Sequence, residues 1–315
     1  MDSLSFAFNA IAPTFTIVLV GILMRKMGYL NEEFIKKGNK LCFSFFLPAL
    51  VFFNIYEAGS VEKDYIRVII YTVILTFLLI GLFLFLVPKF VKDKRKISVM
   101  IQSMYRGNFM LYGIGFSQAL GGDVCVAYAT SMMAVTLPIL NVVGIFVYAY
   151  FSDTKEKPDM KKAALDAIKM PILWGIILGL VFHEVSIQIP DFLYTAGKDI
   201  SKIATPLSFL FLGGQFQFSS SKKHAKLIAV ATLAKLILVP LPFLWFGISV
   251  LHITGIQLIP LLIYLAAPSA ITNYQLAAQF DADAELAGEL LVYTMAFSAL
   301  SMFLLVGGLH AMSFI

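Results

Sequence analysis

Amide and basic side chains stand inside two long apolar stretches of this chain, where polar groups are uncommon. The first stretch contains Arg106 and Asn108 and runs on through Gly113 and Gly115. The second contains Pro268, and its polar side chains are Thr272, Asn273 and Gln275. Polar residues in such stretches commonly line a substrate or ion pathway. An amide both donates and accepts hydrogen bonds, so it can hold a carboxylate without burying a charge. The polar side chains are the candidate binding residues, and the two glycines and the proline are candidates for breaks in the helical backbone.

Each of these residues also has a plain structural interpretation. Asn108 and Asn273 could serve only to bond backbone groups that the glycines and the proline leave free. Arg106 either attracts an anionic substrate or extends its charged end toward the membrane surface. Lys235 is the other basic residue inside an apolar stretch. For Lys235 we favour the extended side chain, because it lies nearer to the end of its stretch.

The sequence predicts neither catalysis nor a cofactor or metal site. Cys42 and Cys125 lie in apolar segments, and we interpret both as packing residues. The pair His183-Glu184 lacks the second histidine that a zinc protease requires. Asp and Glu stand only at the ends of the apolar stretches, which argues against a carboxylate relay at their centre. A sodium site made of carbonyls and amides stays open, with Gln102, Gln118 and Gln275 as its candidates.

The composition requires a lipid environment. Of 315 residues, 59% are hydrophobic and 14% are charged, and the mean hydropathy is +0.85. A transmembrane helix needs about 20 apolar residues. The apolar stretches cover residues 6–24, 40–56, 67–88, 97–119, 124–151, 168–183, 200–218, 227–251, 257–280 and 286–309. We therefore predict an all-α integral membrane protein with ten transmembrane helices. The net charge of +5 comes from basic residues in the loops between the apolar stretches. Aromatic residues are not interleaved with them, so we expect no nucleic-acid partner.

Basic residues are distributed unevenly over the predicted loops. The loops after odd-numbered stretches contain eighteen Lys and Arg residues, and the loops after even-numbered stretches contain four, which are Lys63, Arg67, Lys198 and Lys202. Positively charged loops stay on the cytoplasmic side. The bias therefore predicts that both termini are extracytoplasmic in the cell membrane. The first residues lack the features of a secretory signal, so we expect the first stretch to stay as a helix of the protein.

The two halves of the chain resemble each other. Pro13 and Gly21 match Pro171 and Gly179 at a constant offset of 158 residues. A second offset of 165 aligns Phe46-Leu47 with Phe211-Leu212, Asn108 with Asn273, and Tyr128 with Tyr293. Five stretches in each half require an inverted second copy, an arrangement typical of secondary transporters. The stretches with Asn108 and with Asn273 are the fourth and ninth, and we predict that both helices are interrupted there, near the middle of the membrane.

Three motifs resemble those of the auxin efflux carrier family, which includes bacterial malate-type carriers and the plant PIN proteins. The clearest is Ala267-Pro268-Ser269-Ala270 with the following Tyr274, Ala277, Gln279, Phe280 and Asp283-Ala284-Glu285-Leu286-Ala287, similar to the ninth-helix signature of bacterial members. The others are Phe45-Phe46-Leu47-Pro48-Ala49-Leu50, similar to the second-helix proline motif, and Asn108 with Gly113-Ile114, similar to the fourth-helix crossover. The resemblance covers nearly the whole chain.

The resemblance implies two inverted five-helix repeats with crossover helices four and nine, as in sodium/proton antiporters and bile-acid symporters. It also implies an elevator-type mechanism. A scaffold would comprise residues 1–60 and 154–220, and a transport domain would comprise residues 61–153 and 221–315. In the binding site, Asn108 would contact the substrate carboxylate, and Pro48 and Val51 would form part of the wall. Gly115 stands where many members have the first crossover proline, Asn273 stands where plant members have the second, and Val51 replaces a serine of plant members.

The sequence as a whole predicts a secondary carrier of a small organic anion, such as a malate-type or auxin-like acid. A sodium-coupled carrier of the bile-acid type is the alternative within transport. A membrane receptor that binds an anion without moving it is the alternative from another class. Gly175 and Gly179 form a small-residue pair, which we expect to pack within one chain. A homodimer through the scaffold helices stays open as a further use of such surfaces.

Overall fold

The computed structural model describes residues 2–58, 62–152, 161, 165, 169–215 and 222–315, and regular structure in these ranges is helical throughout. The first half contains α1 (Ser3–Lys26), α2 (Glu32–Leu41), the π-helical turn η1 (Cys42–Phe46), α3 (Leu47–Ala58), the 3-10 turn η2 (Lys63–Tyr65), α4 (Ile66–Phe90), α5 (Lys94–Tyr105) and α6 (Phe109–Phe151). The second half contains α8 (Pro171–Glu184), α9 (Asp191–Lys202), α10 (Ala204–Gly214), η3 (Lys222–His224), α11 (Ala225–Leu233), the π-helical turn η4 (Ala234–Leu238), α12 (Pro240–Ser249), η5 (Gly255–Gln257), α13 (Leu258–Ala266), α14 (Ile271–Gln279) and α15 (Ala284–Ala311).

Among the described residues, six helical segments are long and apolar enough to cross a membrane, which supports an all-α integral membrane protein. They are Ser3–Lys26, Glu32–Glu57, Lys63–Phe90, Phe109–Phe151, Ala225–Ser249 and Ala284–Ala311. Large apolar side chains such as Phe77, Trp245 and Leu300 are more than half exposed on these helices, as a lipid-facing surface requires. The remaining predicted spans fall on shorter or interrupted helices, so the count of ten stays a prediction.

The sequence predicts a turn at Gly121-Gly122-Asp123, between its fourth and fifth apolar stretches, and one long helix contains this turn. Gly122 lies inside α6 with φ +66°, in the left-handed region that glycine adopts readily. Helical backbone precedes and follows this residue, so α6 consists of two helices joined at a kink. The predicted boundaries near residues 60, 153 and 220, and most of the central loop 152–169, lie outside the described residues.

Glycines let two helix pairs approach closely. A Cβ at Gly213 of α10 would overlap the carbonyl of Val18 in α1, 2.9 Å from its carbon atom. A Cβ at Gly175 of α8 would lie 2.5 Å from the carbonyl oxygen of Pro48 in α3. Gly179 packs against the same helix. The small-residue pair is thus used within the chain, as predicted.

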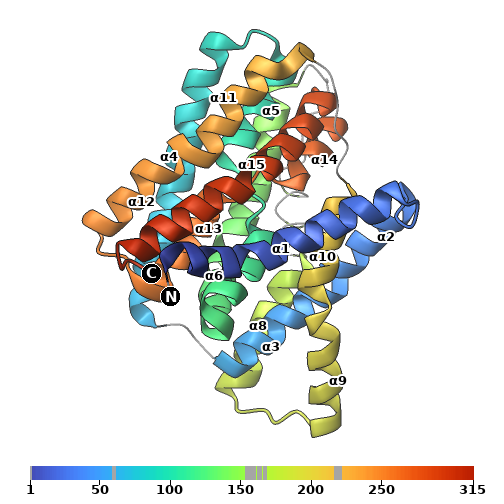
Figure 1. The fold of residues 1–315 in the computed structure, drawn as a ribbon, viewed down its shortest axis with the longest axis vertical. Helices are drawn as coiled ribbons and strands as arrows, with labels where there is room; N and C mark the ends of the chain where they lie inside the picture. Colours follow the sequence, from blue (N-terminus) through green and yellow to red (C-terminus); the bar gives the residue numbers. More distant parts are fainter. Residues whose placement is uncertain (1, 59–61, 153–160, 162–164, 166–168, 216–221) are drawn as a thin grey trace.

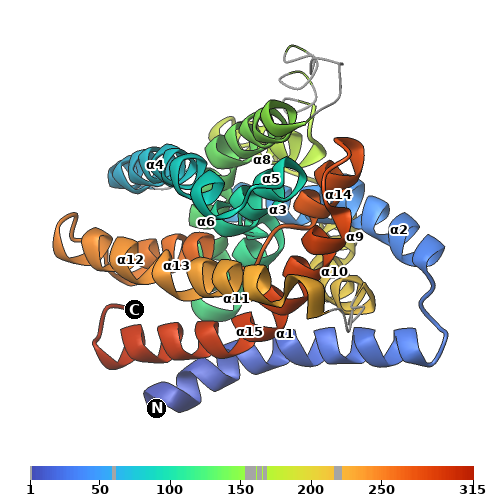
Figure 2. The ribbon, with the colours of Figure 1, turned by 90° about the horizontal axis from the view of Figure 1, so that it is seen from above.

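The helices form two groups with α1 and α15 crossing between them. Figure 1 shows α2, α3, α8, α9 and α10 together at the lower right, and α4, α11 and α12 at the upper left. Figure 2 shows α1 and α15 running side by side along one edge, and these helices are in contact. Near the two termini, Nδ1 of His310 lies 3.0 Å from the Ser3 hydroxyl.

Candidate functional site

Two helices are interrupted in the interior of the protein. The first break separates α5 from α6, and Arg106 there has extended backbone with φ −96° and ψ 109°. The second break separates α13 from α14, and Ala267 there has φ −58° and ψ 141°. Proline has no N–H and favours extended backbone in the residue before it, so Pro268 explains the second break.

The two breaks cross each other as a short antiparallel backbone pair. The backbone N–H of Asn108 donates to the carbonyl of Pro268 at 2.7 Å, and that of Ala270 donates to the carbonyl of Arg106 at 3.3 Å. Gly107 lies opposite Ser269 in this pair. A Cβ at Gly107 would lie 3.0 Å from the carbonyl oxygen of Ala267, so the close approach favours glycine. The pairing satisfies backbone groups that the breaks release from the helices.

Helix ends of both signs meet at this crossing. The N-terminal ends of α6 and α14 begin just after the breaks, and the C-terminal ends of α5 and α13 lie just before them. Free N–H groups make a helix N-terminus positive, and free carbonyls make a C-terminus negative. The crossing can therefore attract an anion at one side and a cation at the other.

The Arg106 side chain is buried beside the crossing. It is 4% exposed, and its guanidinium donates to the Leu140 carbonyl at 3.0 Å and to the Asn141 amide oxygen at 2.5 Å. Gly144 makes room for it, because a Cβ there would lie 2.8 Å from Nη1 of Arg106 and 2.7 Å from Nε2 of Gln102. Arg106 thus does not extend to the membrane surface.

Lys235 also has its charged end at the crossing. It is fully buried in the turn η4, and its Nζ donates to the carbonyl of Leu265 at 3.1 Å. Nζ lies 3.1 Å from the position that a Cβ of Gly107 would take. The expectation that Lys235 extends to the membrane surface is therefore wrong. The free carbonyls at the C-terminal end of α13 attract the ammonium group inward instead.

The two basic side chains have no acidic partner in the described part of the chain. The ion pairs there all involve other groups. Arg106 and Lys235 bond only to carbonyl and amide oxygens. The crossing therefore has two buried basic side chains whose described partners are all neutral dipoles.

The matched amides Asn108 and Asn273 have different surroundings. Asn273 is 1% exposed, and its amide nitrogen donates to the Ser103 hydroxyl at 2.5 Å and to the Val99 carbonyl at 3.4 Å. Its side-chain oxygen accepts from the Tyr148 hydroxyl. Asn108 is 8% exposed, and its amide nitrogen has no hydrogen-bond partner among the described residues. Asn273 therefore joins three helices, and Asn108 has a donor free for a ligand.

The other predicted site residues belong to helices α3, α6 and α14. Gly113 and Gly115 are helical residues of α6 and pack against Phe109, Met133 and Phe209. Pro48 and Val51 belong to α3, where Val51 is fully buried. Thr272 and Gln275 belong to α14, and Gln275 is exposed. The interruption in the fourth stretch therefore precedes the glycines that the sequence analysis associated with it.

Several buried polar atoms near the crossing have no hydrogen-bond partner within the described ranges. They are both amide atoms of Gln102, the Tyr105 hydroxyl, Nδ2 of Asn108, the Ser269 hydroxyl and the Thr272 hydroxyl. Buried polar atoms are nearly always bonded in proteins, so each exception calls for an explanation. Their gathering on α5, the two breaks and the first turn of α14 indicates a place for polar ligands.

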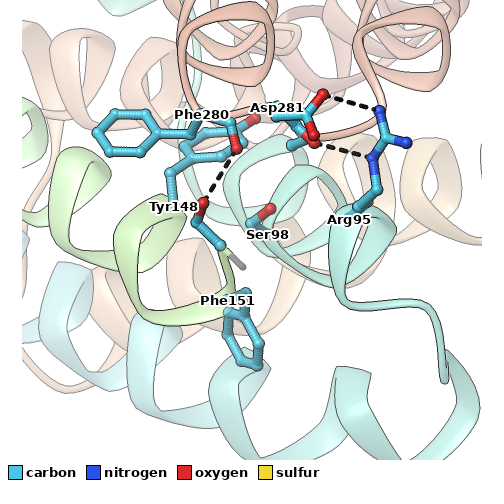
Figure 3. A pocket seen from close by; sticks show the side chains of 8 residues that line it. Arg95, Ser98, Tyr148, Phe151, Phe280 and Asp281 are labelled. Carbon is cyan, nitrogen blue, oxygen red and sulfur yellow. Dashed lines mark hydrogen bonds and ion pairs between the residues drawn. The ribbon is translucent and has the colours of Figure 1, made fainter. Parts of the chain in front are cut away.

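A pocket of about 150 Å³ lies between the start of α5, the end of α6 and the turn after α14. It is lined by Arg95, Ser98, Tyr148, Phe151, Ser152, Phe280, Asp281 and Ala282. Figure 3 shows Arg95 beside Asp281, whose backbone oxygen accepts from Nε at 2.8 Å and whose side chain pairs with Nη2 at 3.2 Å. The Tyr148 hydroxyl, bonded to Asn273, connects this pocket to the second interrupted helix.

Sequence reasoning missed Ser103, Tyr148 and Thr294. The Thr294 hydroxyl of α15 accepts from the backbone N–H of Ser269 at 3.1 Å and so supports the second break. All three are polar residues in apolar stretches, which is the signal that could have found them. Hydroxyl side chains in apolar helices commonly bond the backbone of their own helix, so this signal alone is weak.

The sequence matches the family described as Membrane transport protein over residues 6–306. It is 23% identical to the uncharacterized transporter YfdV of Escherichia coli K12, in an alignment covering 88% of this chain and 90% of that protein. It is 23% identical to an uncharacterized transporter of Methanocaldococcus jannaschii, covering 90% and 92%, and 25% identical to one of Methanothermobacter thermautotrophicus, covering 91% and 93%. These similarities extend over both interrupted helices.

Proposed function

The chain belongs to the membrane transport protein family, which is the auxin efflux carrier family, and on this premise we propose that it is a secondary carrier of a small organic anion. Its relatives are named as transporters, and its long apolar helices make it an integral membrane protein. The anion would bind where the two interrupted helices cross. The site in this proposal consists of the backbone breaks and the side chains around them.

The observation that supports this proposal most strongly is the pair of buried basic side chains at the crossing. Arg106 and Lys235 are 4% and 0% exposed and have no carboxylate partner among the described residues. Removing an ion from water costs several kcal/mol even after relaxation. Two like charges near one crossing add to that cost. A bound anion would offset both terms, because it supplies the missing opposite charge.

Free donors near the two charges favour a carboxylate as the anion. Nδ2 of Asn108 is unbonded, and the hydroxyls of Ser269 and Thr272 also lack partners among the described residues. A carboxylate accepts several such hydrogen bonds at once. The N-terminal ends of α6 and α14 add positive potential at the same place. We propose a malate-type or auxin-like acid, with Asn273 positioning α14 rather than contacting the acid.

We propose an elevator-type mechanism with ten membrane helices in two inverted five-helix repeats. The glycine contacts between α1 and α10, and between α3 and α8, support a rigid scaffold because backbone meets backbone there. The interrupted helices would move together against this scaffold with the bound anion. The pocket beside Arg95 would be its cytoplasmic approach, because Arg95 is basic and its side chain is 57% exposed.

Sodium coupling is the second candidate, and one observation favours it. Gln102 is fully buried, and neither atom of its amide has a partner in the described part of the chain. However, its amide nitrogen and Nη1 of Arg106 lie close to the same Cβ position of Gly144. A neighbouring guanidinium opposes cation binding. We therefore propose that the acid binds without sodium at this place.

Ligand-induced thermal stabilisation of the purified protein tests the proposal. A panel of monocarboxylates, dicarboxylates and indole acids is added with and without sodium, and the melting temperature is measured. Binding stabilises the folded state by about 2.7 kcal/mol at a ligand concentration of 100 Kd. We expect one acid class to raise the melting temperature of the wild type and not of Asn108→Ala.

The matched control is Asn9→Ala, which removes an exposed amide on α1. This variant should respond to the acid as the wild type does. Failure of every acid would overturn the anion proposal. Equal stabilisation of Asn108→Ala would move the site away from the crossing, and stabilisation that requires sodium would favour the coupled carrier. Uptake of the stabilising acid into proteoliposomes then separates a carrier from an anion receptor.

A further inference from the structure

A histidine and three carboxylates gather where α11 and α15 begin, away from the crossing. His224 directly precedes α11, and Asp283 is the N-terminal cap of α15. Nδ1 of His224 lies 2.8 Å from a Glu289 oxygen, and Nε2 lies 3.5 Å from an Asp283 oxygen. One ring nitrogen of His224, one carboxylate oxygen of Asp283 and one carboxylate oxygen of Glu285 all lie within 4.8 Å of one another. His224 and Glu289 are 1% and 4% exposed.

The hydrogen bond to Glu289 determines which ring nitrogen is free. A carboxylate accepts hydrogen bonds, so Nδ1 of His224 carries the hydrogen in this contact, an assignment made from the bonding pattern. In the neutral ring Nε2 then has a lone pair, and it has no hydrogen-bond partner among the described residues. A carboxylate oxygen of Asp283 lies 3.5 Å from Nε2. Two acceptors this close repel, and a cation between them removes the repulsion.

The spacing fits a transition-metal ion. Zinc binds histidine nitrogen and carboxylate oxygen at about 2.0–2.2 Å, so two ligands in tetrahedral geometry lie about 3.4 Å apart. The separation between Nε2 of His224 and the Asp283 oxygen is 3.5 Å. Histidines that bind metals commonly donate their other N–H to a carboxylate, which orients the ring. Glu289 is placed to do this for His224.

We propose that His224, Asp283 and Glu285 bind one divalent transition-metal ion of the zinc class, and that Glu289 orients His224. A nitrogen ligand favours zinc over magnesium and calcium, which prefer oxygen ligands alone. The ion would join the starts of α11 and α15. Glu285 also lies 3.7 Å from Lys223, whose side chain is 61% exposed and can turn away when the metal binds. The proposal is independent of the anion site.

Metal titration of the full chain in detergent, after treatment with a chelator, tests this proposal. Calorimetry with Zn²⁺ and the visible spectrum of Co²⁺ both report binding. We expect one ion per chain and no comparable binding of Mg²⁺ or Ca²⁺. Asp283→Asn should weaken binding at least about tenfold, because ligand and nearby-partner changes have effects of this size. In the wild type, Oδ1 of Asp283 accepts from the Leu286 N–H at 2.9 Å. Asparagine is also a good helix cap, so Asp283→Asn should keep this bond.

Glu289→Gln tests whether Glu289 orients His224, separately from the residues that bind the metal directly. It should weaken Zn²⁺ binding by about 10–100-fold without changing the stoichiometry. His252→Asn is the matched control, because His252 is exposed with φ +53° and asparagine tolerates that backbone. His224→Gln is a second ligand variant, should Asp283→Asn fold poorly. Wild-type protein without stoichiometric Zn²⁺ uptake, or ligand variants that bind as tightly as the wild type, would overturn the proposal.

Discussion

At the scale of single residues, two residues at matching positions in the two halves have different roles in the structure. Asn108 and Asn273 align between the two halves, yet Asn273 is fully bonded and Asn108 has a free donor. The sequence could predict that both are buried and polar. It could not predict the roles, because Ser103 and Tyr148, which bond Asn273, come from other helices. Lys235 was misjudged for a similar reason, since its partner at Leu265 lies on another helix.

Alanine substitutions should separate the two amides. Asn273→Ala should lower the stability of the unliganded protein, because a buried group left without its partner costs about 1–3 kcal/mol and the Ser103 hydroxyl loses the Asn273 amide, while the Tyr148 hydroxyl keeps only its bond to the backbone carbonyl of residue 273. Asn108→Ala should leave stability within about 0.5 kcal/mol, because its amide nitrogen bonds nothing described. Thermal unfolding in detergent checks both. Equal stability of the two variants would contradict the division of roles.

At the scale of helices, the sequence indicates where helices break better than how they meet. Pro268 and Gly122 interrupt helical backbone where the sequence analysis placed an interruption and a turn. The break before Asn108 lies upstream of Gly113 and Gly115, because those glycines serve packing against Phe109, Met133 and Phe209. The antiparallel pairing of Gly107 with Ser269 depends on the arrangement of distant segments. Periodicity within one segment does not contain that information.

The contact between α1 and α10 should tolerate no added methyl group. In Gly213→Ala the new Cβ would meet the backbone of Val18, which cannot turn aside as a side chain can. We expect a loss of about 1–3 kcal/mol, as for other overpacked sites. Gly81→Ala in α4 is the control, because a Cβ there meets nothing within 4 Å. If Gly213→Ala unfolds at the same temperature as the wild type, the prediction is wrong and the two helices can move apart at little cost.

At the scale of the whole molecule, composition alone predicts the class correctly. A chain that is 59% hydrophobic with long apolar helices is an integral membrane protein, and the family match makes it a transporter. The arrangement of helices about the membrane follows less directly. Helices such as α8 and α13 are apolar but shorter than a full membrane span, so hydropathy alone does not show how they are placed in the membrane. Orientation therefore rests on the distribution of basic loop residues.

Labelling of intact cells tests the predicted orientation. In a background without Cys42 and Cys125, Lys202→Cys should react with a membrane-impermeant maleimide, because its loop is predicted to be extracytoplasmic. Lys37→Cys should react only after the cells are opened. Both lysines are well exposed, at 65% and 76%, so access alone does not distinguish them. The reverse pattern would place the termini in the cytoplasm.

The central claim is that unpaired buried cations bind the transported anion, and Lys235→Met tests it most directly. Uptake and binding of the stabilising acid are measured in proteoliposomes, with Lys202→Met as the exposed control. We expect at least about tenfold weaker binding, since a hydrogen bond to a charged group contributes about 1.5–3 kcal/mol. Stability without the acid should be unchanged or higher, because replacing buried charge by apolar volume is often stabilising. Unchanged affinity and uptake in Lys235→Met would contradict the account.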